Sequence, residues 1–236
     1  MTNDLVQLVR GNFNHVMRAL IPESVDVIYT DPPYARKTLF LYDELMLASA
    51  RVLKPGGVLV AIVPQFAIPE VGRWTEMSGL KWRWLCYMDQ TKGPHPRLCN
   101  AAHNIEVMGK VLGWWYKPGG PRNFSQVRDS FVNDPKIGAT HEWEQSLSWA
   151  MYGLRSFCPA GGLVLDPMVG TGTVLEACLR EGVRGIGCDI DNIKLATAEK
   201  RIAATLEDIE RIAALARAQL KMFGEDGEPL AQTVES

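Results

Sequence analysis

Apolar and polar residues follow two different periodicities along this chain. Largely apolar runs at 27–30, 58–63 and 163–165 are rich in β-branched residues, which is typical of buried parallel strands. Between the first two runs, apolar residues recur at helical spacing over 39–53 and stop at a Lys-Pro-Gly-Gly segment. A strand, a helix and a strand joined by short links predict a βαβ unit.

The rest of the chain repeats this alternation and predicts an α/β fold with a doubly wound, mostly parallel sheet. Further strands are expected at 5–9 and 185–189, edge strands at 81–88 and 104–115, and helices at 13–20, 68–79, 141–157, 174–181 and 192–222. The last helix is long, and its apolar stripe continues past the point where a sheet needs cover. We expect partial use of this stripe in a homodimer.

One strand ends in a group of residues that suits a planar, amine-bearing ligand. The run at 27–30 stops at Asp31-Pro32-Pro33-Tyr34. Each proline fixes φ and lacks an N–H, so the turn is stiff and its carbonyls need outside donors. A carboxylate and carbonyls beside an aromatic ring can accept hydrogen bonds from an exocyclic amine while the heterocycle stacks on Tyr34. The plain alternative is that this segment simply terminates a strand.

A second strand end has the layout of a nucleoside-binding site. The strand at 163–165 leads into Asp166, a glycine-rich turn and a helix, and Asp189 ends the next strand 17 residues after Gly172. Glycines let a backbone approach a ligand closely, and an acid at this offset can accept hydrogen bonds from ribose hydroxyls. The pattern is not Gly-x-Gly-x-x-Gly, which disfavours a dinucleotide.

Together these segments resemble the motifs of the S-adenosylmethionine-dependent DNA amino-methyltransferases of the β group, in which the catalytic motif precedes the cofactor motif. The resemblance implies a Rossmann-like methyltransferase fold, methylation of adenine N6 in flipped-out DNA, and a role in restriction–modification or in orphan or phage modification. It assigns catalysis to Asp31, Pro32, Pro33 and Tyr34. It assigns S-adenosylmethionine binding to Asp166, Pro167, Met168, Gly170, Thr171, Gly172, Thr173 and Asp189.

The chain departs from that family at two points, and other functions remain open. Gln145-Ser146 stands where Lys-Pro is common, and the loop after Tyr34 and the target-recognition insertion are both short. Met168 replaces a usual phenylalanine, which is a tolerable apolar exchange. The near alternative is a cytosine-N4 methyltransferase. The resemblance favours adenine over it, because a serine in place of Asp31 is commoner in the cytosine enzymes. An RNA substrate is a weaker option. An alternative of another class is a catalytically inactive methyltransferase fold that binds DNA or protein.

The charge distribution points to the middle of the chain as the DNA surface. The net charge is −2, yet residues 89–140 hold seven Lys and Arg against four acids. Basic and aromatic residues interleave in proline- and glycine-rich loops there, which suits nucleic acid. The predicted DNA contacts are Lys92, Arg97, Arg122 and Arg128. Trp114 and Trp115 could either join this surface or pack a second small core.

Length and composition predict one domain. A chain of 236 residues with 47% hydrophobic content favours a single catalytic domain over 1–223, with short target-recognition insertions within 89–140 and a polar tail at 224–236. We expect no membrane span and no secretory signal. The five cysteines are scattered without a C-x-x-C pair, so we expect reduced thiols, a cytoplasmic location and no metal site.

Overall fold

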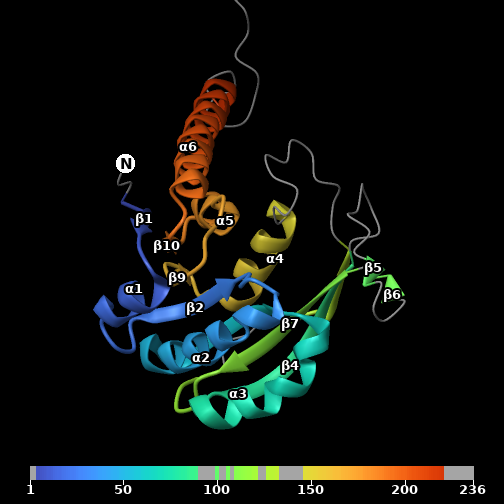
Figure 1. The fold of residues 1–236 in the computed structure, drawn as a ribbon. Helices are drawn as coiled ribbons and strands as arrows, with labels where there is room; N and C mark the ends of the chain where they lie inside the picture. Colours follow the sequence, from blue (N-terminus) through green and yellow to red (C-terminus); the bar gives the residue numbers. More distant parts are fainter. Residues whose placement is uncertain are drawn as a thin grey trace, which may run out of the picture.

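A single large sheet organises the molecule (Figure 1). The computed structural model describes residues 4–89, 99–100, 105–106, 109–121, 126–132 and 146–220. The sheet has eight strands in the order β1 (Val6–Arg10), β10 (Arg184–Asp189), β9 (Leu163–Asp166), β2 (Val25–Thr30), β3 (Leu53–Val63), β7 (Gly109–Tyr116), β4 (Lys81–Asp89) and β8 (Ser130–Val132). Only β7 runs against its neighbours in this sheet. The described residues also include a small pair, β5 (Cys99–Asn100) and β6 (Ile105–Glu106).

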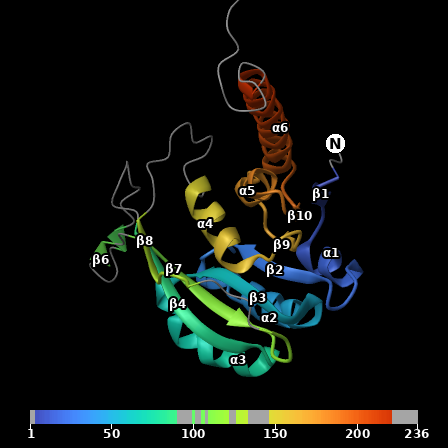
Figure 2. The ribbon, with the colours of Figure 1, turned by 180° about the vertical axis from the view of Figure 1, so that it is seen from behind.

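Helices cover both faces of the sheet (Figures 1 and 2). One face packs on α1 (Phe13–Ala19), α2 (Phe40–Val52) and α3 (Val71–Ser78), and the other on α4 (Leu147–Phe157), α5 (Thr173–Glu181) and the first half of α6 (Asn192–Leu220). Side chains of a strand alternate between faces, so Val27 and Tyr29 enter the core with α4 and α5 while Ile28 enters the opposite core. The two 3₁₀ turns η1 (Arg36–Thr38) and η2 (Gln65–Glu70) follow β2 and β3.

The structure confirms the predicted doubly wound α/β fold, and it corrects the placement of two strands. The segment predicted as an edge strand at 104–115 forms β7, which lies between β3 and β4. Its residues from Val111 to Trp115 are buried, as expected for a strand covered on both faces. The segment predicted as an edge strand at 81–88 forms β4, whose last residues pair with the edge strand β8. The predicted helix at 141–157 begins at Leu147, and residues 133–145 lie outside the described part.

The tryptophans of β7 belong to the core, so the idea that they contact nucleic acid is wrong. Trp115 is fully buried, packs edge-on against Trp82 and donates its indole N–H to Thr75 Oγ1 at 2.9 Å. Trp114 is buried on the opposite face and packs edge-on against Phe157.

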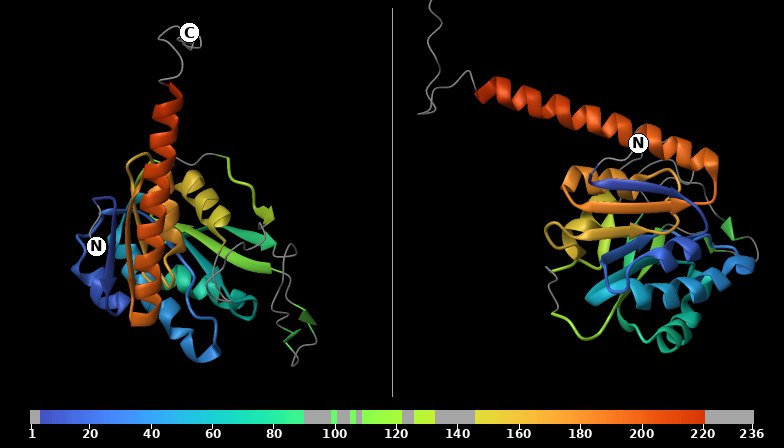
Figure 3. Two further views of the ribbon diagram at one scale, coloured as in Figure 1. Left: turned by 90° about the horizontal axis from the view of Figure 1, so that it is seen from above. Right: turned by 90° about the vertical axis from the view of Figure 1, so that its left-hand side faces the viewer.

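Helix α6 extends well beyond the sheet (Figure 3). Leu195, Ala198 and Ile202 are buried near its start, whereas every residue from 211 to 219 is exposed. None of the helices that the structure describes is long and apolar enough to pass through a membrane. The predicted polar tail at 224–236 lies outside the described residues.

Candidate active site

Carboxylates gather at the carboxyl ends of three neighbouring parallel strands. Asp31 follows β2, Asp166 ends β9 and Asp189 ends β10, and these strands are adjacent in the sheet. Ligands of open α/β sheets bind outside this edge, close to the point where strand order reverses. The structure therefore brings the two predicted motifs, 135 positions apart in the sequence, to one edge of one sheet.

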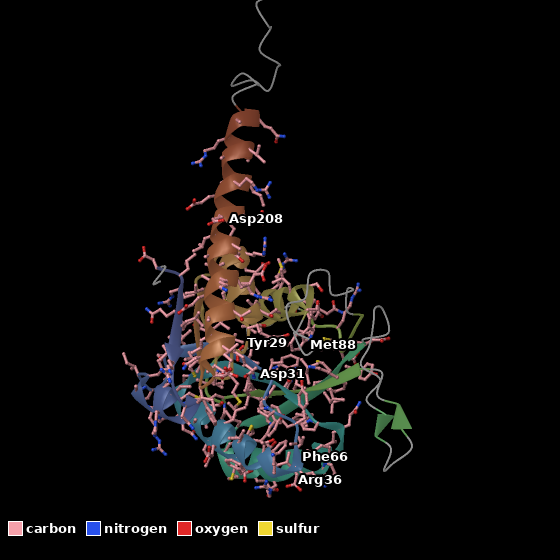
Figure 4. All side chains as sticks on the ribbon, turned by 45° about the horizontal axis from the view of Figure 1, so that its top comes forward. Tyr29, Asp31, Arg36, Phe66, Met88 and Asp208 are labelled. Carbon is pink, nitrogen blue, oxygen red and sulfur yellow. The ribbon has the colours of Figure 1, made fainter. Side chains whose placement is uncertain are left out.

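Asp31 and Tyr34 are joined by a hydrogen bond, and a lysine joins them (Figure 4 labels Asp31). Tyr34 Oη donates to Asp31 Oδ2 at 2.7 Å, and Lys110 Nζ lies 3.0 Å from the same oxygen. Lys110 Nζ also donates to Tyr34 Oη and lies 5.1 Å from the centre of its ring. Burial and the Asp31 charge raise the pKa of Tyr34 well above its usual value, so the hydroxyl stays protonated and donates.

The turn that carries Asp31 and Tyr34 is stabilised by hydrogen bonds from Thr38. Thr38 Oγ1 donates to the Pro33 carbonyl at 3.0 Å and to the Ala35 carbonyl at 2.7 Å. Within the described ranges, no protein group donates to the Pro32 carbonyl. Pro32 is buried, whereas Pro33 is exposed. The Pro32 carbonyl can therefore accept from a ligand beside Asp31, as predicted for an exocyclic amine.

Asp166 is buried and forms hydrogen bonds within the protein. Its Oδ1 accepts from Thr30 Oγ1 at 2.8 Å and from the Met168 backbone N–H at 3.2 Å. Burial raises the pKa of Asp166 to about 7, while the bonds from Thr30 and Met168 act in the opposite direction. These contacts fix the start of the glycine-rich turn against the end of β2.

Asp189 organises the same turn from the next strand. Its Oδ2 accepts from the Gly170 N–H at 3.0 Å and its Oδ1 accepts from the Asp191 N–H at 2.9 Å. A carboxylate oxygen has two lone pairs, so each can still accept from a ribose hydroxyl. Asp191 instead caps α6, because its Oδ1 accepts from the N–H groups of Ile193 and Lys194.

The backbone of the glycine-rich turn is open to a ligand at one glycine and closely packed at the other. Gly170 and Gly172 have φ values of +51° and +87°, which side chains disfavour. A Cβ on Gly170 would meet open space, whereas one on Gly172 would lie 2.9 Å from the Ala198 side chain. Gly170 thus leaves backbone accessible to a ligand, and Gly172 lets α6 pack closely. No side chain caps the start of α5, whose N–H groups favour an anionic group such as a carboxylate.

The other predicted cofactor residues differ in how exposed they are to solvent. Met168 and Thr171 are partly exposed at the turn, while Pro167 is buried. Thr173 is buried and accepts a hydrogen bond from Arg201 of α6 at 3.1 Å, so its hydroxyl is used within the protein. Of the two residues that replace Lys-Pro, Ser146 is buried and directly precedes α4, and Gln145 lies outside the described residues.

Comparison of the chain with known proteins finds similarity to DNA methyltransferases. No protein-family model matches the chain. In sequence it is similar to the type II methyltransferase M.HpaI of Haemophilus parainfluenzae, with 24% identity over 246 residues that cover 87% of this chain and 77% of that protein. In structure it is similar to TTHA0409 of Thermus thermophilus, assigned as a DNA modification methylase, with TM-score 0.70 and 22% identity over 85% of this chain and 95% of that one. The protein has the fold of the DNA methyltransferases.

Two further solved structures share this methyltransferase fold. The complex of M1.HpyAVI with S-adenosylmethionine matches with TM-score 0.68 and 21% identity, over 84% of this chain and 99% of that one. The cytosine-N4-specific PvuII DNA methyltransferase matches with TM-score 0.69 and 16% identity, over 84% and 86%. The fold therefore does not distinguish an adenine acceptor from a cytosine acceptor.

Sequence reasoning missed Lys110, which completes the site. Because β7 is antiparallel, its first residues lie at the same edge as the ends of β2 and β3, and the pairing of Val63 with Val111 places Lys110 just past the end of β3. A Cβ at Gly109 would lie 2.4 Å from the Met88 carbonyl oxygen, so glycine permits the close approach that sets this register. Only the strand order, which no local pattern reveals, could have identified Lys110.

A second missed feature is a basic and aromatic pair beside the Asp-Pro-Pro-Tyr turn. The Arg36 guanidinium of η1 lies 4.7 Å from the centre of the Phe66 ring of η2 (Figure 4). Both residues are exposed, and Lys37 and Phe40 are exposed next to them. In the part of the chain that the structure describes, neither Arg36 nor Lys37 pairs with an acid.

The structure describes only one of the four predicted DNA contacts. Lys92, Arg97 and Arg122 lie outside the described residues. Arg128 is exposed just before β8, and its backbone N–H donates to Tyr152 Oη at 2.7 Å. Among the described residues, no cluster of histidine, cysteine and acidic side chains could hold a metal ion.

Proposed function

We propose that the protein is a DNA methyltransferase that transfers a methyl group from S-adenosylmethionine to the exocyclic N6 of adenine. The observation that carries this proposal is the placement of Asp31, Pro32 and Tyr34 at the edge that also holds the glycine-rich turn and Asp189. The sequence similarity to a type II methyltransferase supports it.

The cofactor would be held by the turn after β9. The N–H groups at the start of α5 would face its carboxylate, and Asp189 would accept from the ribose hydroxyls. When bound, S-adenosylmethionine supplies an electrophilic sulfonium methyl group. With this arrangement the protein needs only to orient the amine and to stabilise the charge that develops on it.

The catalytic turn would orient the target amine. The nitrogen lone pair of an aromatic amine is delocalised into the ring and is a poor nucleophile. Asp31 and the Pro32 carbonyl would accept both amine hydrogens, which aims the lone pair at the methyl group. The Asp31 carboxylate also stabilises the positive charge that forms on the nitrogen, and the proton then leaves to Asp31 or to water.

The base must leave the duplex to reach this site. Flipping costs a few kcal/mol, and stacking on Tyr34 returns roughly 1–3 kcal/mol. The exposed pair Arg36 and Phe66 lies beside the turn and suits the adjoining DNA, because the cation can meet phosphate and the ring can stack on a base. Lys92, Arg97, Arg122 and Arg128 remain candidates for further phosphate contacts.

Cytosine N4 is the second candidate acceptor. It presents the same amine to Asp31, and a cytosine-N4-specific enzyme shares the fold. Adenine is preferred because the aspartate at the first motif position is typical of adenine enzymes in the family that the chain resembles.

One experiment tests both acceptors together. DNA from cells that express the protein is sequenced with modified-base detection, beside DNA from cells that express Asp31→Ala. We expect N6-methyladenine at one recurring sequence with the wild type only. N4-methylcytosine would select the second candidate. The absence of methylation together with no calorimetric binding of S-adenosylmethionine would favour an inactive binding module.

A further inference from the structure

Asp31 and Lys110 place a hydrogen-bond acceptor beside a hydrogen-bond donor at the catalytic edge. Asp31 Oδ2 and Lys110 Nζ are 3.0 Å apart, and their side chains are 18% and 16% exposed. Lys110 belongs to neither sequence motif. It comes from β7, which inserts between β3 and β4.

The ammonium group has hydrogen-bonding capacity left for a ligand. It carries three N–H donors, and two of them face Asp31 Oδ2 and Tyr34 Oη. Within the described residues, Lys110 makes no further hydrogen bond or ion pair. A ligand that stacks on Tyr34 therefore lies within reach of the third donor.

The backbone of Lys110 is fixed on both sides. Lys110 pairs with Met88 of β4, and the adjoining Val111 pairs with Val63 of β3. Gly109 packs too closely on Met88 and on the Tyr87 ring to tolerate a side chain. The flexible lysine stem can adjust over a ligand while its origin stays in place.

We infer that Asp31 and Lys110 together read the Watson–Crick edge of the target base, with Asp31 accepting from the amine and Lys110 donating to the neighbouring ring nitrogen. This inference rests on the proposed function and names how its site selects a base. Adenine N1 and cytosine N3 both accept hydrogen bonds beside an amine. Guanine and thymine show the reverse order, a carbonyl oxygen beside an N–H.

The pair therefore selects amino bases over keto bases. A keto base would set its carbonyl against the Asp31 carboxylate and its N–H against the Lys110 ammonium. Both contacts leave a charged group facing a mismatched partner, which costs more than losing a hydrogen bond. Because adenine and cytosine satisfy the pair equally, Lys110 would not distinguish between them.

A competing explanation is that Lys110 is only the counter-ion that holds Asp31. Both explanations predict weak activity for Lys110→Met, so loss of activity alone does not separate them. The decisive variable is the ring nitrogen of the substrate. Replacing the target adenine by 1-deazaadenine, or the target cytosine by 3-deazacytosine, exchanges that nitrogen for C–H and retains the amine.

The experiment measures single-turnover methylation of matched duplexes that carry the normal or the deaza base at the methylated position. Wild type, Lys110→Met and Lys110→Arg are compared, with Lys54→Met as a control. Lys54 forms an ion pair with Asp26 at 2.8 Å, at the opposite end of β2 from the catalytic turn, so its variant reports the loss of a paired lysine elsewhere. Any intrinsic effect of the deaza base on amine reactivity is common to all four proteins.

We expect the deaza base to slow wild type and Lys54→Met by roughly 10- to 100-fold more than it slows Lys110→Met, the value of a hydrogen bond to a charged group. Lys110→Arg should keep part of this sensitivity because it keeps a donor. Equal sensitivity in all proteins would overturn the inference and leave the proposed function intact. If Lys110→Met does not fold, wild type alone decides: a deaza base that slows its methylation by less than about twofold would overturn the inference. No methylation of either normal base would defeat the proposed function, and the inference with it.

Discussion

Thr30 Oγ1 donates a hydrogen bond to Asp166 Oδ1 at 2.8 Å, and both residues are buried. This bond joins the last residue of β2 to the first residue of the predicted cofactor motif. Each predicted motif is therefore positioned by the other. We expect a change at either residue to affect methyl transfer through geometry, because both side chains are buried.

The first prediction concerns Asp166 and pH. Burial raises its pKa to about 7 in the folded protein, above the value of 3.8 for an ordinary carboxyl. Between these two pKa values the folded protein holds a proton on Asp166 that the unfolded protein has lost. The contribution of Asp166 to the free energy of unfolding is therefore most favourable below about pH 4 and is lost as pH rises towards 7. Asp166→Asn cannot ionise and should gain stability relative to wild type between about pH 4 and 7.

Chemical denaturation at several pH values measures this difference. The matched control is Asp208→Asn, which removes a half-buried carboxylate of α6 that pairs with Arg180 and Arg211. If the unfolding free energies of Asp166→Asn and wild type change in parallel over this range, Asp166 does not titrate as a buried acid.

The second prediction concerns the hydroxyl of Tyr34. The sequence predicts that the Tyr34 ring stacks on the target base. Tyr34→Ala should therefore lose more activity than Tyr34→Phe or Tyr34→Trp, which keep an aromatic ring. The structure adds bonds from the hydroxyl to Asp31 and Lys110. Tyr34→Phe should therefore lose roughly 1–2 kcal/mol of transition-state stabilisation, or about 5- to 30-fold in rate. Single-turnover rates of the three variants test the order, and full activity of Tyr34→Phe would show that the hydroxyl is unimportant.

The third prediction separates two neighbouring acids. Asp189→Ala should weaken S-adenosylmethionine binding by about 1.5–3 kcal/mol, because it removes charged acceptors for the ribose. Asp191→Ala should cost about 1 kcal/mol of folding stability through loss of the α6 cap, with little effect on the dissociation constant. Calorimetry and thermal unfolding of both variants give the two values. The reverse pattern would move the ribose site to Asp191.

The fourth prediction concerns the DNA surface. Arg36→Ala should weaken binding to target and scrambled duplexes alike and reduce the salt slope by about one unit if the guanidinium meets a phosphate. Arg128→Ala, and variants of Lys92, Arg97 and Arg122, test the surface predicted from sequence in the same titration. Arg155→Ala is a suitable control, because Arg155 is paired with Glu181 on α5. An unchanged salt slope for Arg36→Ala would show that Arg36 of η1 makes no phosphate contact.

The fifth prediction concerns the far half of α6. Ile212 and Leu215 are 52% and 56% exposed on a helix that leaves the sheet, and the apolar stripe favours a homodimer. Light scattering at tens of micromolar should give a dimer for the full chain and a smaller mass for Ile212→Lys combined with Leu215→Lys. A monomeric full-length protein would exclude this contact.

Local sequence patterns predicted the parts of the site that lie within single strand–turn units. Asp31, Tyr34, Gly170 and Asp189 all lie within a few residues of the end of a predicted strand, so the pattern locates them at one sheet edge. Lys110 and the pair of Arg36 with Phe66 were missed because they depend on contacts between distant segments. Trp114 and Trp115 were ambiguous for the same reason, since their burial follows from the insertion of β7 between two strands.

The most direct test of the central claim compares wild type with Asp31→Ala for transfer of a labelled methyl group to DNA, with cofactor binding measured on the same samples. Asp31 accepts hydrogen bonds from Tyr34 and Lys110, and neither of these residues belongs to the glycine-rich turn. We expect methylated DNA with wild type, a loss of more than about 100-fold with Asp31→Ala, and similar affinity of both proteins for S-adenosylmethionine. Methylation by Asp31→Ala within tenfold of wild type would contradict the central claim.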